Sequence, residues 1–182
     1  MRRSAHRIVL LLTILLANGC SPIPVWTDGE VPFVATPADV VDRMLEAARV
    51  KSGDVLYDLG SGDGAIVIRA AKKYGAKGVG IEIDTELVRK ARDNAFKEKV
   101  DHLVEFRIQD ALAADVSAAT VVTLYMLPDF NAKLRPIFDK QLKSGSRVVS
   151  HDYGIQGWVP DRVETIKGNF VHDHTILLFE VR

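Results

Sequence analysis

Hydrophobic positions recur along this chain with two spacings, one typical of helices and the other typical of buried strands. Helical spacing predicts four helices, at residues 36–50, 65–74, 85–99 and 130–142. Short apolar or alternating runs predict seven strands, at 54–59, 78–83, 104–109, 120–124, 147–150, 163–166 and 175–181. Because strands and helices alternate, the pattern predicts an α/β fold with a doubly wound, mostly parallel sheet and helices on both faces.

The first of these helices has a clear start signal. Thr36 is the expected N-cap, Pro37 fits the first turn, and Asp39 lies where the helix dipole favours an acid. Because Thr36 could instead contact a bound ligand, both roles are kept open.

Composition narrows the class of protein. The chain has 24 Lys and Arg against 24 Asp and Glu, with 47% hydrophobic and 26% charged residues. These values are ordinary for a globular domain and argue against disorder and against a polytopic membrane protein. No basic excess indicates a nucleic-acid partner, so none is expected.

The N-terminus has the pattern of an export signal. Arg2, Arg3 and Arg7 precede an apolar stretch at 8–17, which as a helix would span about 15 Å, half of a bilayer core. The single cysteine, Cys20, follows Leu16-Ala17-Asn18-Gly19. This arrangement resembles a bacterial lipoprotein signal, in which the cysteine is lipidated and becomes the new N-terminus. The alternative is an uncleaved anchor with an idle thiol.

The expected organisation follows from this signal. Residues 1–19 form a signal peptide, 20–30 a lipidated cysteine with a short tether, and 31–182 the folded domain. The predicted location is the bacterial cell envelope, with the domain anchored to a membrane and facing the periplasm or the exterior.

The candidate chemistry lies at the ends of the first three expected strands. Asp58-Leu59-Gly60-Ser61-Gly62-Asp63-Gly64 follows a strand and opens a helix, Glu82 comes 20 residues after Gly62, and Asp110 follows the third strand. The glycines allow a sharp turn and close approach of a ligand, and Glu82 can accept from two ribose hydroxyls. Together these residues predict a nucleoside site.

Two ligands compete for such a site. Residues 60–65 satisfy the G-x-G-x-x-[GA] pattern of NAD-binding proteins. However, Asp58 and Asp63 would repel a pyrophosphate, whereas S-adenosylmethionine carries an ammonium and a sulfonium and no phosphate. The expected cofactor is therefore S-adenosylmethionine, and no metal is expected.

These motifs resemble those of class I S-adenosylmethionine-dependent methyltransferases over residues 31–182. Asp58–Gly64 is similar to that family's first motif and Gly80-Ile81-Glu82-Ile83-Asp84 to its second. Two shorter strings, Val31–Pro37 and Gly145–Ser150, resemble the lysine methyltransferases of the ATP synthase c subunit and the adenine nucleotide translocase. The resemblance implies a seven-stranded, Rossmann-like sheet whose last strand is antiparallel.

The resemblance also implies roles for individual residues. Asp58 would hold the methionyl ammonium beside a backbone lined by Gly60 and Gly62. Glu82 would bind the ribose, Ile83 would pack on the adenine, and Asp110 would accept from its amine.

The catalytic residues are less well marked. The segment after the fourth strand is Leu124-Tyr125-Met126-Leu127-Pro128, without the amide or carboxylate common in amine methyltransferases, which disfavours methylation of nucleic-acid bases. Tyr125 could orient an amine, and His151 could accept a proton. Asp152 is expected to face away from His151, since neighbours on an extended chain alternate. His172 and His174 are expected to form a surface pair with no third metal ligand.

The predicted function is a membrane-tethered S-adenosylmethionine-dependent methyltransferase, most simply a protein-lysine N-methyltransferase acting on a membrane-associated protein. Two alternatives stay open: a non-catalytic lipoprotein that binds an adenine nucleoside, and an NAD-dependent oxidoreductase. The export signal favours the first alternative, because S-adenosylmethionine is made in the cytosol.

Overall fold

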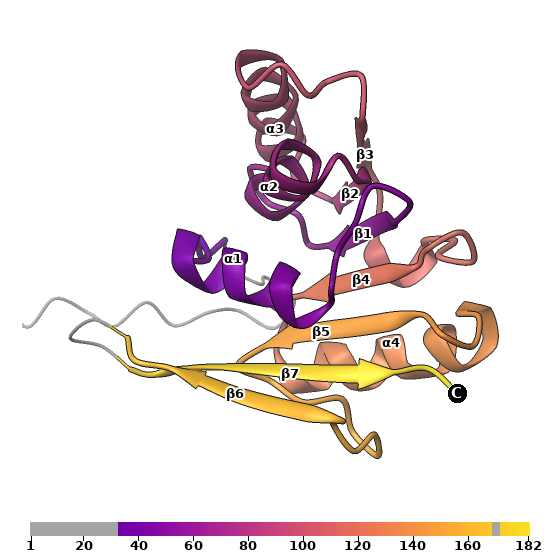
Figure 1. Ribbon diagram of the computed structural model, residues 1–182. Coiled ribbons are helices and arrows are strands. Elements are labelled where there is room, and N and C mark those ends of the chain that lie inside the picture. The colour runs from indigo at the N-terminus through magenta and orange to yellow at the C-terminus, as the bar shows by residue number, and fades with distance from the viewer. Residues whose placement is uncertain (1–32, 169–171) are drawn as a thin grey trace, which may run out of the picture. The chain divides into compact units, whose positions relative to one another are not determined.

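The structure, a computed structural model, describes residues 33–168 and 172–182, and all of them belong to one compact unit, Val31–Arg182 (Figure 1). The predicted signal peptide, Cys20 and the whole tether lie outside the described residues. Within the described ranges, no helix is both long enough and apolar enough to cross a membrane.

A seven-stranded sheet forms the centre of the domain. Its strands are β1 (Val55–Leu59), β2 (Lys77–Glu82), β3 (Val104–Ile108), β4 (Val121–Leu124), β5 (Arg147–His151), β6 (Arg162–Ile166) and β7 (His174–Glu180). The spatial order is β3-β2-β1-β4-β5-β7-β6, and all pairs are parallel except those made by β7. The predicted fold is confirmed, including the antiparallel insertion of the last strand between β5 and β6.

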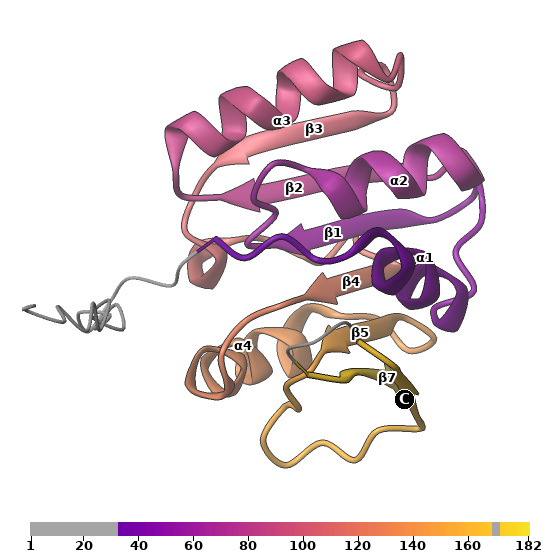
Figure 2. The same ribbon diagram turned by 90° about the vertical axis from the view of Figure 1, so that its left-hand side faces the viewer.

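Helices cover both faces of the sheet. They are α1 (Ala38–Ala47), α2 (Ala65–Tyr74), α3 (Thr85–Lys97) and α4 (Pro128–Gln141), with a short 3-10 helix η1 (Ala111–Ala113). The first three helices lie on one face and α4 on the other (Figures 1 and 2). Each expected helix is present, with ends that differ from the predicted bounds by a few residues.

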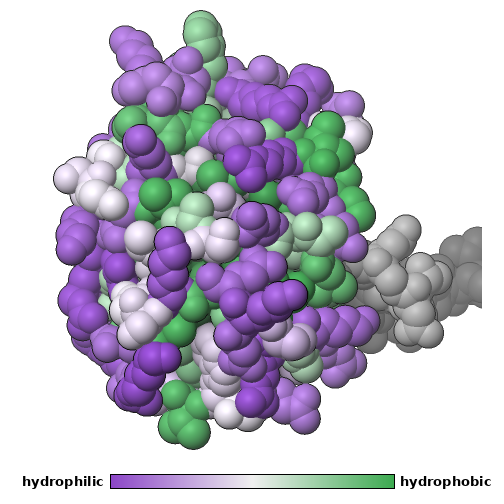
Figure 3. All heavy atoms as spheres, turned by 90° about the vertical axis from the view of Figure 1, so that its right-hand side faces the viewer, coloured by the Kyte–Doolittle hydropathy of each residue, from purple (hydrophilic) through white to green (hydrophobic). Residues whose placement is uncertain are grey.

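Each helical layer closes its own hydrophobic core against the sheet. Under α1, α2 and α3 the fully buried side chains include Met44, Leu45 and Val67, and under α4 they include Leu134 and Phe138. Met44 and Leu45 lie four residues after the buried Val40 and Val41, and Phe138 lies four after Leu134, which explains why helical periodicity predicted the layers. The view from the right of Figure 1 shows a mostly hydrophilic surface with small hydrophobic groups (Figure 3).

The start of α1 differs from the prediction. The N-cap residue is Pro37, and no side chain caps the helix, so the expected cap by Thr36 is wrong. Pro37 has an extended ψ of 146°, and its carbonyl accepts the first helical bond from Val41. The chain therefore enters the helix one residue later than expected, which leaves Thr36 one position too early to cap it.

Candidate functional site

The parallel strands β1, β2, β4 and β5 end at the same edge of the sheet. From β1 the chain winds outward to β2 and β3, and it then returns to β4 on the other side of β1. In such folds ligands bind at this edge, where the winding reverses. The residues at these four strand ends are Asp58, Glu82, Tyr125 and His151.

Asp58 is a buried carboxyl group on the central strand. It lies between Gly80 of β2 and Thr123 of β4, and the Thr123 hydroxyl donates a 2.7 Å hydrogen bond to its Oδ1. Burial, with a smaller contribution from the charge of Glu82, raises the pKa of Asp58 to about 7. A cation next to this carboxyl group would favour its ionised form.

The loop after β1 brings the backbone, rather than side chains, to the surface of the site. Gly60, Gly62 and Gly64 all have positive φ. The amides of Gly60 and Ser61 donate to the carbonyl of Ile81, which ties the loop to the end of β2. A Cβ on Gly64 would lie 2.6 Å from the ring of Phe106, so only glycine fits this turn.

Glu82 is held rigidly at the end of β2. Its Oε2 accepts from the amide of Gly62 at 2.9 Å, and its Oε1 accepts from Ile83 at 2.8 Å and Asp84 at 3.0 Å. Oε1 already accepts two hydrogen bonds, but Oε2 accepts only one, so Oε2 can still accept from a ligand hydroxyl. Asp84 is the N-cap of α3.

The two residues expected to bind an adenine are both accessible. Ile83 is 71% exposed, so its apolar side chain is available to pack against a flat ligand ring. Asp110 lies two residues beyond β3 rather than at its end, and its Oδ1 caps η1 by accepting from Leu112. The cap orients this exposed carboxylate and leaves its second oxygen for another donor.

These features fit S-adenosylmethionine better than a dinucleotide. Asp58 is buried, and within residues 33–168 and 172–182 no Lys or Arg lies within ion-pair distance of it. A buried carboxylate without a cation is unfavourable, and the cofactor's ammonium would supply one. The buried hydroxyl of Ser61 also lacks a partner at this loop. When bound, the cofactor supplies both the methyl group and its own leaving group.

Aromatic side chains form the other half of this edge. The half-buried Tyr125 follows β4, and its ring centroid lies 3.9 Å from that of His151 and 6.4 Å from that of Tyr153, which is nearly parallel to it. Burial, and then the charge of Asp152, raise the pKa of the Tyr125 hydroxyl above its ordinary value. The hydroxyl is therefore protonated at neutral pH and able to donate.

The expectation that His151 and Asp152 face apart is wrong. Asp152 has a φ of 61°, a left-handed conformation that ends the strand and turns its carboxylate back, so its Oδ2 lies 3.4 Å from His151 Nε2. The same oxygen contacts His172 Nε2 at 3.0 Å, and His174 Nδ1 lies 3.0 Å from His151 Nε2. His172 and His174 are therefore part of a larger group, and a third possible metal ligand is present.

The surroundings of His151 make it a weak proton acceptor. Its side chain is fully buried, and burial lowers its pKa to about 4. Such an imidazole is neutral at pH 7 and holds an additional proton poorly.

Sequence reasoning missed several residues of this edge. Thr123, the partner of Asp58, was detectable as a polar position within an otherwise apolar buried run. Phe33 packs over Gly62, where a Cβ would lie 2.2 Å from the ring, and only the resemblance around 31–37 pointed to that segment. Tyr153 carries no local signal, because its position depends on the turn after β5.

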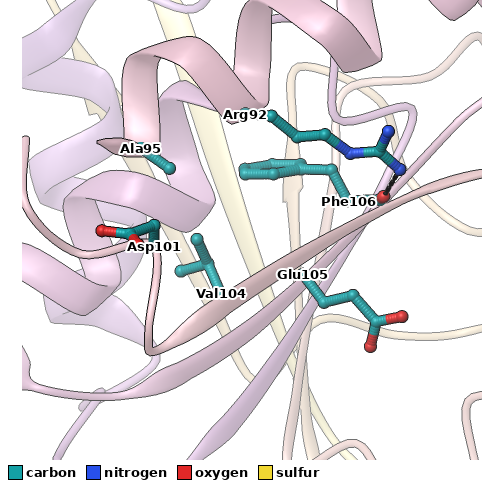
Figure 4. Close-up of a pocket in the computed structure, with 6 residues that line it drawn as sticks. All are labelled: Arg92, Ala95, Asp101, Val104, Glu105 and Phe106. Carbon is teal, nitrogen blue, oxygen red and sulfur yellow. Dashed lines mark hydrogen bonds between the residues drawn. The ribbon is translucent and has the colours of Figure 1, made fainter. Parts of the chain in front are cut away.

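A pocket elsewhere in the domain is separate from this edge. It has a volume of about 260 Å³ and lies between α3 and the sheet-edge strand β3, lined by residues that include Arg92, Val104 and Phe106 (Figure 4). Arg92 donates to the carbonyl of Phe106, so its charged group covers part of the edge strand. None of the predicted site residues lines it.

The fold, the glycine loop and the acids at successive strand ends define a class I S-adenosylmethionine-dependent methyltransferase. The comparisons with known proteins agree. The model of the ANTKMT methyltransferase domain matches residues 58–162. The chain belongs to this family, and its cofactor is S-adenosylmethionine rather than NAD.

Individual relatives add detail. A protein-lysine N-methyltransferase of Saccharolobus islandicus is 44% identical over 83% of this chain and 94% of its own length. The lysine N-methyltransferase of the ATP synthase c subunit from Xenopus laevis is 32% identical over 73% of this chain, which spans 58% of that protein. The crystal structure of an RNA methyltransferase from Salinibacter ruber with S-adenosyl-L-homocysteine is 57% identical, with a TM-score of 0.76 over 81% of this chain and 94% of that one.

Proposed function

We propose that this enzyme transfers a methyl group to the amine of a protein lysine. One observation carries the proposal: the strand end beside the cofactor loop presents Tyr125, a half-buried aromatic ring, and not an amide or carboxylate. An electron-rich ring face attracts an alkylammonium, and its hydroxyl can orient the neutral amine. Relatives named as protein-lysine methyltransferases support the same substrate class.

The aromatic group can position the acceptor without reacting itself. Methyl transfer is an in-line displacement, so alignment of the amine with the methyl group supplies much of the rate. His151 packs against the Tyr125 ring, and the Tyr153 ring lies nearly parallel to it. We therefore assign Tyr125 as the residue that orients the amine and His151 as its support.

RNA is the second candidate acceptor, since the similar structure from Salinibacter ruber carries the name RNA methyltransferase. The balanced charge of this chain gives RNA no electrostatic advantage. The experiment must therefore offer both acceptors.

The full-length enzyme, incubated with tritium-labelled S-adenosylmethionine and separate protein and RNA fractions of host cells, tests the proposal. We expect label in protein that resists ribonuclease, and methyllysine after acid hydrolysis. The label should fall with Tyr125→Phe, and at a limiting cofactor concentration it should fall further with Glu82→Ala. Label found only in RNA would assign the other acceptor, and cofactor binding without label in either fraction would favour the non-catalytic alternative.

We also propose that the enzyme is tethered to a bacterial membrane through Cys20 and acts there on a membrane-associated protein. The support is the basic, apolar and small-residue order of the first twenty residues. Acylation of the wild type, and its absence in Cys20→Ser, is the expected result in cells fed a labelled fatty acid. Equal labelling of both proteins would exclude the lipid anchor, and a domain facing the cytosol by protease protection would exclude the envelope location.

A further inference from the structure

Two histidines and an aspartate gather where β5 ends and β7 begins. His151 is the last residue of β5, Asp152 follows it, and His174 opens β7, which runs antiparallel beside β5. We call these three residues the histidine cluster. Among the described residues, these three are the histidine, cysteine or acidic side chains whose ligand atoms lie close enough together to hold one metal ion.

The distances within the histidine cluster suit a small cation. His151 Nε2 lies 3.0 Å from His174 Nδ1 and 3.4 Å from Asp152 Oδ2. His174 Nδ1 and Asp152 Oδ2 are 3.8 Å apart. Ligands bonded tetrahedrally to zinc at 2.0–2.1 Å lie about 3.3 Å from one another. A metal ion therefore fits between the three atoms with only small side-chain movements.

The surroundings hold the carboxylate in place. Oδ1 of Asp152 accepts from the amide of Thr175 at 2.8 Å, and Oδ2 contacts His172 Nε2 at 3.0 Å. Bonds of this kind, made by groups outside the ligand set, commonly orient metal-binding carboxylates. The left-handed backbone of Asp152, rare for a residue other than glycine, is maintained by these contacts.

Charge also favours a cation. The side chains of Asp152 and His174 are each 13% exposed, and that of His151 is fully buried. Among the described residues, the Asp152 carboxylate has only imidazoles within ion-pair distance, and no Lys or Arg. A mostly buried carboxylate beside two imidazole nitrogens, with no Lys or Arg near it, offers a negative charge that a divalent ion would neutralise.

We propose that His151, Asp152 and His174 bind a divalent transition-metal ion, with zinc as the expected occupant and His172 as the outer partner of the carboxylate. Two imidazoles and one carboxylate suit zinc and its first-row neighbours, whereas calcium and magnesium prefer oxygen ligands alone. The metal fastens the end of β5 to the start of β7. Because His151 packs on Tyr125, the metal also fixes the position of the aromatic wall of the acceptor site.

The test uses the full-length chain, freed of metal with EDTA and titrated with zinc by calorimetry and with Co²⁺ by visible absorption. We expect one equivalent of zinc, and a Co²⁺ spectrum of four- or five-coordinate type. His174→Ala and Asp152→Asn should weaken zinc binding by at least a hundredfold, and His172→Ala by about 10- to 100-fold. His102→Ala, which changes an exposed histidine in the turn before β3, is the matched control and should bind as the wild type does.

Folding of each variant is checked by its affinity for S-adenosyl-L-homocysteine, since the cofactor loop shares no residue with the histidine cluster. Absence of stoichiometric zinc uptake by the wild type would overturn the proposal. Unchanged zinc affinity in His174→Ala would also overturn it, because the ion would then bind elsewhere, such as at Cys20 or His6.

Discussion

The sheet edge that carries the site has two halves, a cofactor half around the glycine loop and an acceptor half around Tyr125, and they are built in opposite ways. Most of the cofactor half comes from two short, continuous segments, 58–64 and 80–84, to which Asp110 and Thr123 are added, and its internal contacts are mostly made by backbone amides. The acceptor half joins side chains from three separate segments, around 125, 151–153 and 172–174. The geometry of the cofactor half is therefore set mainly by local backbone contacts and tolerates few substitutions. The acceptor half depends on side chains, which can be substituted to suit a different substrate.

The two halves also differ in charge. The cofactor half contains two acids, Asp58 and Glu82, whose charge suits a cationic cofactor, and Glu82 is held by three amides. The acceptor half is an aromatic surface with one carboxylate, Asp152, among imidazoles. Changes in the first half should alter cofactor affinity, and changes in the second should alter turnover.

The largest effect is expected from the backbone of the cofactor loop. Gly64 and Gly145 have nearly the same φ, 84° and 86°, but a Cβ would meet Phe106 at 2.6 Å on Gly64 and nothing within 4 Å on Gly145. Gly145→Ala should cost about 1 kcal/mol of unfolding free energy, and Gly64→Ala about 2–4 kcal/mol because crowding adds to backbone strain. Urea unfolding measures both losses of unfolding free energy. Equal losses would show that backbone strain alone, without crowding against Phe106, sets the cost.

Loss of the ribose acceptor should be the next largest effect. Glu82→Ala removes a charged partner worth about 1.5–3 kcal/mol, so cofactor affinity should fall roughly 10- to 150-fold, with Asp58→Ala at least as damaging. Calorimetric titration with S-adenosyl-L-homocysteine measures the loss. Glu86→Ala, on the exposed side of α3, is the control and should bind normally. A wild-type affinity in Glu82→Ala would remove Glu82 from the site.

The pH dependence of cofactor binding tests the charge of Asp58. With a pKa of about 7, this group is ionised above pH 7 and becomes protonated below it. Affinity for the cationic cofactor should therefore fall as pH drops from 7 to 5, approaching tenfold per unit, while Asp58→Asn binds weakly at every pH. A flat wild-type profile would contradict the pairing of Asp58 with the ammonium.

The same pKa predicts the opposite trend for the protein without cofactor. The folded state retains the Asp58 proton to about pH 7, whereas the unfolded chain releases it near the ordinary value of 3.8. The contribution of this group to stability is full below about pH 4 and is lost as pH rises to 7. In urea unfolding, the wild type should therefore lose stability relative to Asp58→Asn between pH 4 and 7. A constant difference between the two proteins would contradict the raised pKa.

The smallest effect is expected in the acceptor half. Tyr125→Phe removes one hydroxyl that orients the amine, so turnover should fall about 5- to 10-fold while cofactor affinity is unchanged. Tyr74→Phe, at the far end of α2, serves as control. Unchanged turnover in Tyr125→Phe would leave the ring, and not the hydroxyl, as the functional part.

The sequence by itself determined the layers, the mostly parallel sheet and the position of the glycine loop and its neighbouring acids at the strand ends. The reason is physical: periodicity of apolar residues selects helix or strand locally, and Asp58–Gly64 and Glu82 act within a few residues of where they stand in the chain. Errors at this level were small, such as the N-cap at Pro37 instead of Thr36.

Only the tertiary structure decided the acceptor half. Alternation along an extended chain predicted that His151 and Asp152 face apart, but the left-handed turn at Asp152, held by the amide of Thr175 on β7, reverses this. The meeting of His151 with His174 depends on the antiparallel pairing of β5 and β7 across more than twenty residues. No local pattern encodes such contacts, because their free energy comes from strand pairing and burial in the whole sheet.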